Sequence, residues 1–200
     1  MRMRWLAALL FAGGLAAGLG AGLTRTAHAS DPTRPARPWN EIFLPFGSAT
    51  GTAMCVDVPG GTGAPGARLQ LYHCHAYASD GASQRWSLSC AGGSGCASGS
   101  RFYQLSNPGS DLCIGFPGGG VPANGARLVQ ESCGQVPAWQ LVPQGRKSRG
   151  GHPYVMLETS GPGGPALCMT AGNLGEENHT PLVAAPCQGF GNAAEILELG

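Results

Sequence analysis

The apolar residues of this chain lie in short runs that are separated by glycine, proline and polar turn residues. No window has the sustained 3.6-residue apolar period of an amphipathic helix. Short runs bounded by turn residues are typical of β-strands. The pattern therefore predicts an all-β protein with strands at Ile42–Phe46, Met54–Val58, Arg68–His73, Gln84–Leu88, Phe102–Ser106, Leu112–Phe116, Arg127–Glu131, Trp139–Val142, Tyr154–Glu158, Leu167–Thr170, Leu182–Ala184 and Glu195–Leu199.

A pattern of two cysteines and one leucine occurs three times along these runs. The leucine stands five residues before the second cysteine and fourteen or fifteen after the first. The first two copies share the tetrapeptide Gly-Ala-Arg-Leu, and each copy closes on a bulky residue two positions before a leucine. Matching spacings indicate a threefold repeat of four strands each, which suits a closed antiparallel architecture. The copies are Cys55, Leu69, Cys74; Cys113, Leu128, Cys133; and Cys168, Leu182, Cys187, closing on Trp86, Trp139 and Leu197.

The first 29 residues have the composition of a secretory signal peptide. Arg2 and Arg4 precede an apolar stretch, Trp5–Leu23, and an A-x-A cleavage site follows at residues 27–29. A membrane anchor is the alternative, because the stretch is nearly long enough to span a bilayer, but its glycine and alanine content favours cleavage. We expect a secreted protein with no span in the mature chain, a Pro-rich leader over residues 30–40 and one domain over residues 41–200, with repeats at about 41–89, 101–142 and 152–200.

All eight cysteines lie beyond residue 29, and an even number in an exported chain indicates a full set of disulfides. The repeat predicts pairing within each copy: Cys55 with Cys74, Cys113 with Cys133, Cys168 with Cys187, which leaves Cys90 with Cys96. His73 and His75 flank Cys74, but strand alternation places both on the face opposite this cysteine, and no CxxC motif occurs. We therefore expect no metal site.

The charge balance of the mature chain argues against a nucleic-acid partner. Loss of residues 1–29 removes three of the twelve basic residues, so nine face eleven acidic residues and the net charge is −2. Nucleic-acid binding normally needs a concentrated basic face. The one basic run, residues 146–149, lies in a Gly- and Pro-flanked segment, Gln144–Pro153, and is expected to be a solvated loop.

The first copy ends in Gln84-Arg85-Trp86, and a cysteine-pair repeat that ends in Gln-x-Trp resembles the ricin-B-type β-trefoil lectins. The resemblance covers about residues 41–200. It implies a disulfide-stabilised β-trefoil of three pseudo-repeats with four strands each, in which the closing Trp86, Trp139 and Leu197 are core residues. The motif is intact only once: the second copy keeps the tryptophan alone and the third only a bulky apolar residue.

The resemblance also implies a sugar site in the first copy. Galactose-binding members carry a carboxylate two residues after the first cysteine, an aromatic residue two before the second, and polar residues at and before the glutamine. A carboxylate accepts hydrogen bonds from sugar hydroxyls, and an aromatic ring stacks on the apolar face of the sugar. The alternative is structural, with the carboxylate capping the turn at residues 59–61 and the aromatic residue simply half-buried. The matching residues are Asp57, Gln70, Tyr72, Ser83 and Gln84.

The other two copies lack this set. Gly115 and Glu131 stand at the carboxylate and aromatic positions of the second copy, and Thr170 and Ala185 at those of the third. We therefore expect one working site at most. A single shallow site binds with a dissociation constant on the order of millimolar, so useful avidity needs several copies or a multivalent partner.

Catalysis is not expected. Glycoside hydrolysis usually needs two carboxylates about 5–10 Å apart, and the first copy offers Asp57, with Asp80 in a loop. Residues 61–66 match G-x-G-x-x-G but join two strands, whereas a dinucleotide site joins a strand to a helix. We expect a non-enzymatic lectin without a cofactor that binds galactose-type glycans or glycoproteins.

A second hypothesis is a β-trefoil that binds proteins through its loops and does not bind sugar. Trefoils also serve as protein-binding scaffolds, such as protease inhibitors and the cell-binding subunits of toxins that accompany a separate toxin or enzyme chain. The candidate contact loops, Cys90–Cys96 and Gln144–Pro153, lie between repeats, where insertions are tolerated. Residues 178–180, Asn-His-Thr, also form a glycosylation sequon.

Overall fold

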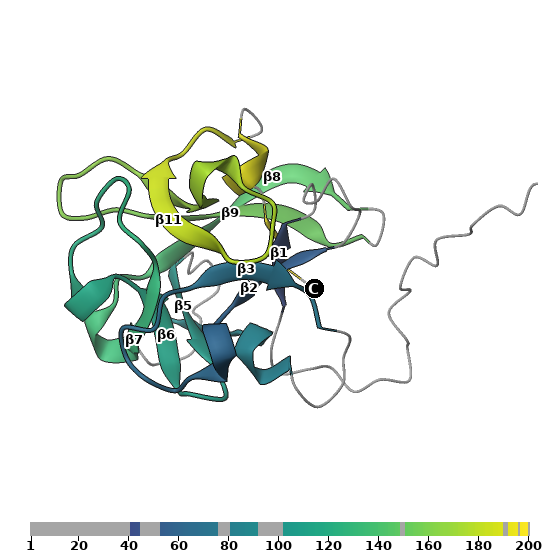
Figure 1. Ribbon diagram of the computed structural model, residues 1–200. Coiled ribbons are helices and arrows are strands. Elements are labelled where there is room, and N and C mark those ends of the chain that lie inside the picture. The colour runs from purple at the N-terminus through teal and green to yellow at the C-terminus, as the bar shows by residue number, and fades with distance from the viewer. Residues whose placement is uncertain are drawn as a thin grey trace, which may run out of the picture.

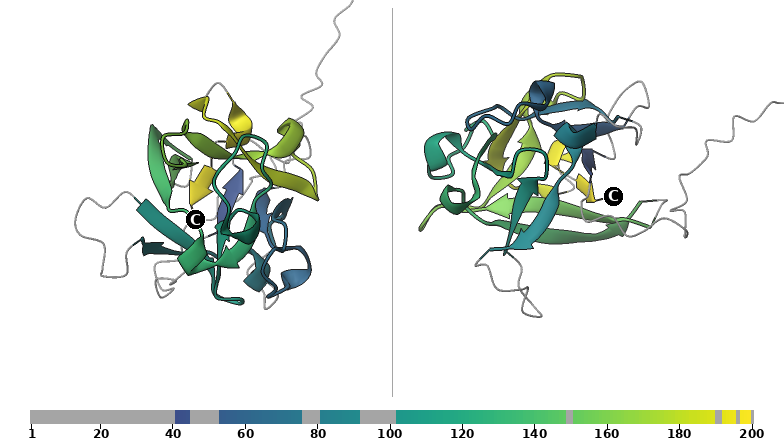
Figure 2. Two further views of the ribbon diagram at one scale, coloured as in Figure 1. Left: turned by 90° about the vertical axis from the view of Figure 1, so that its left-hand side faces the viewer. Right: turned by 90° about the horizontal axis from the view of Figure 1, so that it is seen from below.

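The computed structural model describes residues 41–44, 53–75, 81–91, 102–148, 151–189, 192–195 and 197–199. Within these ranges the chain forms strands and short 3-10 turns around one central core (Figures 1 and 2). Among the described residues, no helix has the length and apolar character needed to cross a bilayer. The strands are β1 (Ile42–Leu44), β2 (Met54–Asp57), β3 (Gln70–His73), β4 (Ser87–Cys90), β5 (Phe102–Asn107), β6 (Leu112–Gly115), β7 (Val129–Ser132), β8 (Trp139–Lys147), β9 (Pro153–Thr159), β10 (Leu167–Ala171), β11 (Thr180–Pro186) and β12 (Leu197–Leu199).

The strands form a β-trefoil, as the repeat predicted. Antiparallel pairing links β4, β5, β8, β9, β12 and β1 in that order. The remaining strands form one hairpin in each repeat: β2 with β3, β6 with β7, and β10 with β11. Because β1 pairs with β12, the first and third repeats are joined directly at the two ends of the described chain.

The repeated leucines meet where the three hairpins join. The backbone N–H of Leu69 donates to the carbonyl of Leu128 at 2.9 Å, Leu128 donates to Leu182 at 2.9 Å, and Leu182 donates back to Leu69 at 3.2 Å. All three side chains are buried. The constant distance between leucine and second cysteine therefore follows from a closed ring of hydrogen bonds that each repeat completes with the same residue.

The closing tryptophans are core residues. Trp86 and Trp139 are fully buried, and each indole N–H donates to a backbone carbonyl, of Val56 at 3.1 Å and Ile114 at 3.0 Å. Leu197 is also fully buried. The structural role expected for these three positions is confirmed, and the burial of each such side chain is worth about 1.5–3 kcal/mol.

Three disulfides connect the cysteines within each repeat, as predicted: Cys55–Cys74, Cys113–Cys133 and Cys168–Cys187. Their sequence separations are 19, 20 and 19 residues, and in the chain-entropy description each such loop contributes about 3 kcal/mol to stability. The fourth predicted pair, Cys90 with Cys96, cannot be followed because Cys96 lies outside the described residues.

Several strand bounds differ from those expected. Gln84 and Glu195 lie in 3-10 turns, η2 (Gly81–Gln84) and η7 (Ala193–Glu195), and each following strand begins later. The expected loop over residues 144–153 was wrong for residues 144–147, which belong to β8. The strand continues through its proline and glycine because β9 supplies partners across a register shift, and Lys147 pairs with Pro153.

Candidate functional site

The β2–β3 hairpin brings the predicted carboxylate and aromatic residue together. Asp57 lies opposite Gln70, and Cys55 lies opposite Tyr72. Strand alternation places Gln70 and Tyr72 on one face. Gln70 Nε2 donates a hydrogen bond of 2.8 Å to Asp57 Oδ2. The N-cap residue of the following 3-10 turn, η1 (Pro59–Gly61), is Val58 and not Asp57, and the Asp57 carboxylate is held by Gln70.

Ser83 and Gln84, from η2, contact the two ends of the hairpin: Ser83 the end at Asp57 and Gln84 the end at His73. Gln84 Oε1 accepts from the backbone N–H of His75 at 2.9 Å, and its Nε2 donates to the carbonyl of His73 at 3.1 Å. The carbonyl of Ser83 accepts from the backbone N–H of Val58, the residue after Asp57, at 3.0 Å. Both residues are buried. Gln84 thus fixes the backbone on both sides of Cys74, just after Tyr72.

Imidazole rings surround Tyr72, which is half-buried. The ring centroid of His75 lies 5.6 Å from that of Tyr72 in an edge-on arrangement, and that of His179 lies 5.3 Å away, also edge-on. His73 lies at 4.3 Å in a tilted arrangement. Such edge-on contacts are favourable for aromatic rings and hold their orientation. Tyr72 is therefore fixed as a platform by neighbours from two repeats.

The segment before β11, in the third repeat, adds two residues that were not predicted for this site. His179 Nδ1 lies 3.1 Å from Gln70 Oε1, and the His179 backbone N–H donates to the Leu71 carbonyl at 2.9 Å. Asn178 Oδ1 accepts from the backbone N–H of His73 at 2.8 Å. In Figure 1, β11 and β3 lie side by side. These contacts complete a chain of hydrogen bonds from Asp57 through Gln70 to His179.

The equivalent position in the second repeat is filled by the protein itself. A Cβ atom added at Gly115 would lie 2.2 Å from Val136 Cγ1, so no side chain fits at the carboxylate position. Glu131, at the aromatic position, accepts from the backbone N–H of Gly118 at 3.0 Å. These residues stabilise local turns and offer no ring for stacking.

The third repeat likewise lacks a carboxylate and an aromatic ring at these positions. Thr170 is buried and its hydroxyl donates to the carbonyl of Cys168 at 3.1 Å. Ala185 has no ring to stack on a sugar. Of the three equivalent positions, the first alone combines a carboxylate, an amide and an aromatic ring.

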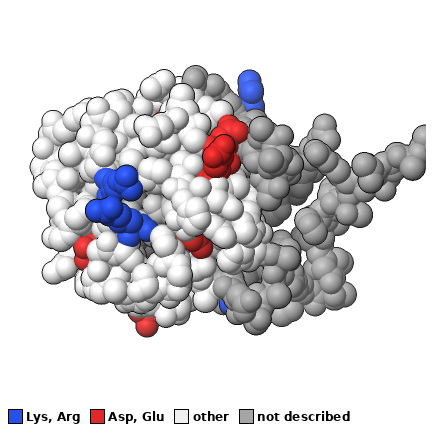
Figure 3. All heavy atoms as spheres, in the orientation of Figure 1, with Lys and Arg blue, Asp and Glu red and all other residues white. Residues whose placement is uncertain are grey.

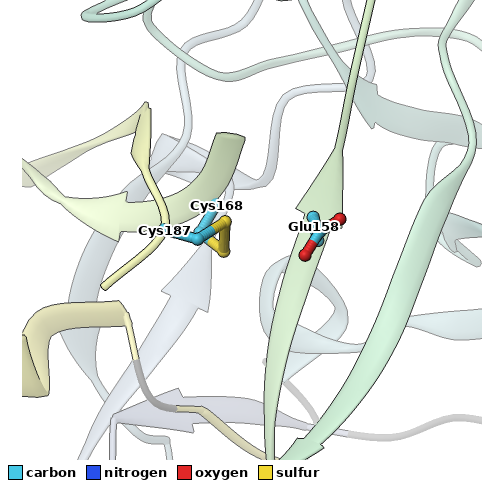
Figure 4. A group of neighbouring side chains, drawn as sticks. All are labelled: Glu158, Cys168 and Cys187. Atoms are coloured by element: carbon cyan, nitrogen blue, oxygen red, sulfur yellow. A yellow bond between two sulfur atoms is a disulfide. The ribbon is translucent and has the colours of Figure 1, made fainter. Parts of the chain in front are cut away.

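One group of potential metal ligands lies elsewhere, between β9 and β10. Ligand atoms of Glu158, Cys168 and Cys187 are within 4.8 Å of one another. Figure 4 shows the two sulfurs joined in the disulfide beside the Glu158 carboxylate. Cysteine binds metals as a thiolate, so the disulfide removes two of the three ligands.

The charged side chains are few on the face shown in Figure 3. Some of the lysine and arginine side chains form a small group there, other basic side chains stand apart from it near the upper right of the view, and the acidic side chains are scattered. Arg68 and Arg127 are exposed and lie on strand segments bridged to Val129 and Val183, around the leucine ring. No continuous basic face is visible in this view.

Comparisons with known proteins agree with the β-trefoil fold. Residues 48–131 match the family model described as a ricin-type beta-trefoil lectin domain-like family. The matched segment contains all of the predicted sugar-site residues and ends within β7 in the second repeat. The resemblance to ricin-B-type β-trefoil lectins is therefore confirmed. No curated protein sequence matches the chain significantly.

Solved structures share the fold. ThreeFoil, a designed threefold-symmetric protein, has a TM-score of 0.60 and 18% identity over 82% of this chain and 98% of its own. The ricin B-like lectin of Macrolepiota procera, solved with lactose, has a TM-score of 0.55 and 16% identity over 84% of this chain and 98% of its own. The cytolethal distending toxin of Haemophilus ducreyi has a TM-score of 0.54 and 14% identity over 85% and 88%. At such identities the likeness establishes the β-trefoil fold alone.

Proposed function

We propose that this protein is a secreted, non-catalytic lectin that binds galactose-type sugars through a single site in the first repeat. The observation that carries the proposal is the Asp57–Gln70 pair beside the Tyr72 ring. The carboxylate of Asp57 accepts hydrogen bonds from two neighbouring hydroxyls, while Tyr72 packs against the apolar face of the sugar.

The surrounding contacts support this arrangement. Asp57 is 4% exposed and its carboxylate is already oriented by Gln70, so little side-chain freedom is lost when a sugar binds. Ser83 and Gln84 form the polar end of the site, where Gln84 holds the backbone after Tyr72 in place. Export is supported by the within-repeat disulfides, which form and persist in oxidising compartments.

The test is a glycan array with the wild-type protein and the variant Asp57→Asn. Asparagine keeps the shape of the side chain and its contact with Gln70, but its single oxygen already accepts from Gln70 and has one lone pair left, so it can accept from only one sugar hydroxyl. We expect the wild-type protein to bind galactose-terminated glycans weakly. The affinity of the variant should be lower by about tenfold or more. Thr170→Ala, at the equivalent position of the third repeat, is the matched control and should bind like the wild type.

Binding that survives in the Asp57→Asn variant would place the sugar elsewhere. A wild-type protein that binds no glycan at millimolar ligand would refute the proposed function. Circular dichroism of each variant must match the wild type, so that loss of binding is not loss of folding.

A protein-binding scaffold, such as the cell-binding subunit of a toxin, is the second candidate. The structural likeness to the cytolethal distending toxin supports it. A pull-down with the purified chain from host-cell extracts distinguishes the two functions. A lectin releases its partners when free galactose is added or when the extract is deglycosylated, whereas a protein-binding scaffold retains them.

A further inference from the structure

The third repeat has a histidine at a left-handed backbone position where the other two repeats have a glycine. Gly66 and Gly125 both have φ of +79°, and their backbone N–H groups donate to the carbonyls of Gln130 and Ala184 at 2.8 Å. His179 makes the corresponding bond to Leu71 at 2.9 Å and has φ of +69°. All three positions precede a ring leucine by three residues. The trefoil therefore requires a left-handed backbone here, and the third repeat meets it with a histidine.

A histidine in the left-handed region has a backbone strain that glycine avoids. Histidine is enriched there relative to most side chains, but the conformation remains uncommon. Nothing in the core explains its presence, because the His179 side chain is exposed. Strain of this kind is found most often at functional sites. What the His179 ring contacts therefore indicates whether this histidine has a functional role.

The His179 ring points at the first-repeat site. Its Nδ1 lies 3.1 Å from Gln70 Oε1, and its centroid lies 5.3 Å from that of Tyr72. Gln70 in turn donates to Asp57. The equivalent glycine in the first repeat has the same relation to the next site, because a Cβ at Gly66 would lie 4.0 Å from Glu131 Oε1. In these two cases the left-handed residue lies beside the aromatic position of another repeat, and it carries a side chain where that repeat has Asp57, Gln70 and Tyr72.

The segment is also held firmly against β3. Asn178 Oδ1 accepts from the His73 N–H at 2.8 Å, and its Nδ2 lies 3.3 Å from His73 Nδ1. Thr180 closes the turn through its backbone N–H to the Glu177 carbonyl at 3.1 Å. His179 is therefore pre-positioned before a ligand arrives, which lowers the entropic cost of binding.

We propose that His179 is a binding and specificity residue of the first-repeat sugar site, contributed by the third repeat. This inference rests on the proposed function. Gln70 occupies Nδ1, so Nε2 remains to donate to or accept from a hydroxyl of the sugar above Tyr72. The ring also limits the space beside Tyr72 and so restricts which hydroxyl configuration fits there.

The experiment compares His179→Gly and His179→Ala with the wild-type full chain, using immobilised galactose-terminated glycans and thermal unfolding. Both variants should bind about three- to tenfold more weakly, as expected for one lost hydrogen bond. His179→Gly should nevertheless keep about the wild-type Tm, because the strain that it relieves offsets the lost contacts with Gln70 and Tyr72, whereas His179→Ala keeps the strain and loses the same contacts, so its Tm should be lower. Weaker binding by His179→Gly at an unchanged Tm is an outcome that a purely structural role does not produce.

Asn173→Gly is the matched control, because Asn173 also has a positive φ, of 54°, but lies in the turn η5 (Gly172–Leu174) and makes no contact with the site. It should change stability without changing affinity. If His179→Gly binds as tightly as the wild type while Asp57→Asn does not bind, the role of His179 is refuted and the lectin proposal stands. If the wild-type chain binds no glycan, both proposals fail.

Discussion

Glu195 occupies in the third repeat the position that Gln84 occupies in the first. Gln84 Oε1 accepts from the N–H of His75, the residue after the second cysteine, and Glu195 Oε1 accepts from Gln188, also the residue after the second cysteine. The other terminal atom of the side chain is Nε2 in Gln84 and Oε2 in Glu195. Gln84 Nε2 donates to a carbonyl, whereas Glu195 Oε2 is buried without a hydrogen-bond partner. Burial raises the pKa of Glu195, and the hydrogen bonds from the Gln188 and Gly189 backbone oppose this shift.

This difference predicts the effect of Glu195→Gln on stability. A carboxyl group whose pKa is higher in the folded than in the unfolded state stabilises the fold below its unfolded pKa, and this contribution is lost as pH rises through the folded pKa. The wild-type protein should therefore lose stability as the pH rises above the ordinary pKa of a glutamate and through the raised pKa of Glu195. Because glutamine does not ionise and supplies the missing donor, the variant should be more stable at pH 7 by about 1–2 kcal/mol.

Urea unfolding of both proteins at pH 4 and pH 7 measures this difference. The advantage of the variant should shrink at pH 4, where the wild-type carboxyl is protonated and can itself donate a hydrogen bond. A variant less stable than the wild type at pH 7 would mean that the charged carboxylate is needed by the fold.

The candidate site was predictable from single residues only in part. Asp57, Gln70 and Tyr72 were found because their spacings from the cysteines match the family, and the hairpin does place them together. His179 was missed because no motif marks it. Aligning its segment with Gly66-Ala67-Arg68-Leu69 would have shown a histidine in place of a glycine, and its consequence depends on a contact between repeats that sequence spacing does not contain.

At the scale of elements, the turn after the second strand of each repeat requires two consecutive left-handed residues. Gly60 and Gly61 supply them in the first repeat, and the equivalent Gly118–Gly119 pair in the second, with φ between 61° and 70°. The third repeat uses Asn173 and Leu174, with φ of 54° and 53°. Leucine is poorly suited to this region, and its side chain is 67% exposed, so burial does not offset the strain.

Leu174→Gly should therefore stabilise the protein. The left-handed conformation costs a leucine about 1–2 kcal/mol, which the substitution removes. Glycine has more entropy in the unfolded chain, and this cancels about 0.5–1 kcal/mol of the stabilisation. A net increase of up to about 1 kcal/mol in the free energy of unfolding is expected. Leu174→Ala, which keeps the unfavourable φ, serves as the control. Equal stabilisation by alanine would attribute the effect to the exposed apolar side chain instead.

Strand positions were predicted well and strand ends poorly. The extension of β8 to Lys147 was missed because Pro143 and Gly145 look like breakers, yet β9 provides pairing beyond them. Gln84 and Glu195 were placed in strands because they adjoin apolar residues, whereas their side chains bond to backbone in the turns before β4 and β12. Such ends depend on tertiary partners that local sequence does not specify.

At the scale of the whole molecule, the repeats are not independent units. Each leucine of the hydrogen-bonded ring takes its partner from another repeat, and β1 pairs with β12. The spacing of the cysteines, the leucine and the bulky closing residue was sufficient to predict the threefold fold, because each of these positions has the same structural role in every copy. It did not predict that residues of the third repeat contact the candidate site in the first. The repeats differ in sequence at the positions of Asn178 and His179, which make these contacts.

This dependence predicts the behaviour of a truncated chain that ends at Ser148. Such a chain keeps all five predicted sugar-site residues and two of the three described disulfides but loses β9–β12, so β1 and β8 lose partners and the leucine ring opens. We expect no cooperative thermal transition, and red-shifted tryptophan emission because Trp86 and Trp139, fully buried in the whole protein, become solvated. Glycan binding should be lost as well. A truncated chain that melts cooperatively and still binds would show that the first two repeats form the site alone, and the contacts of the third repeat with β3 would then be incidental to binding.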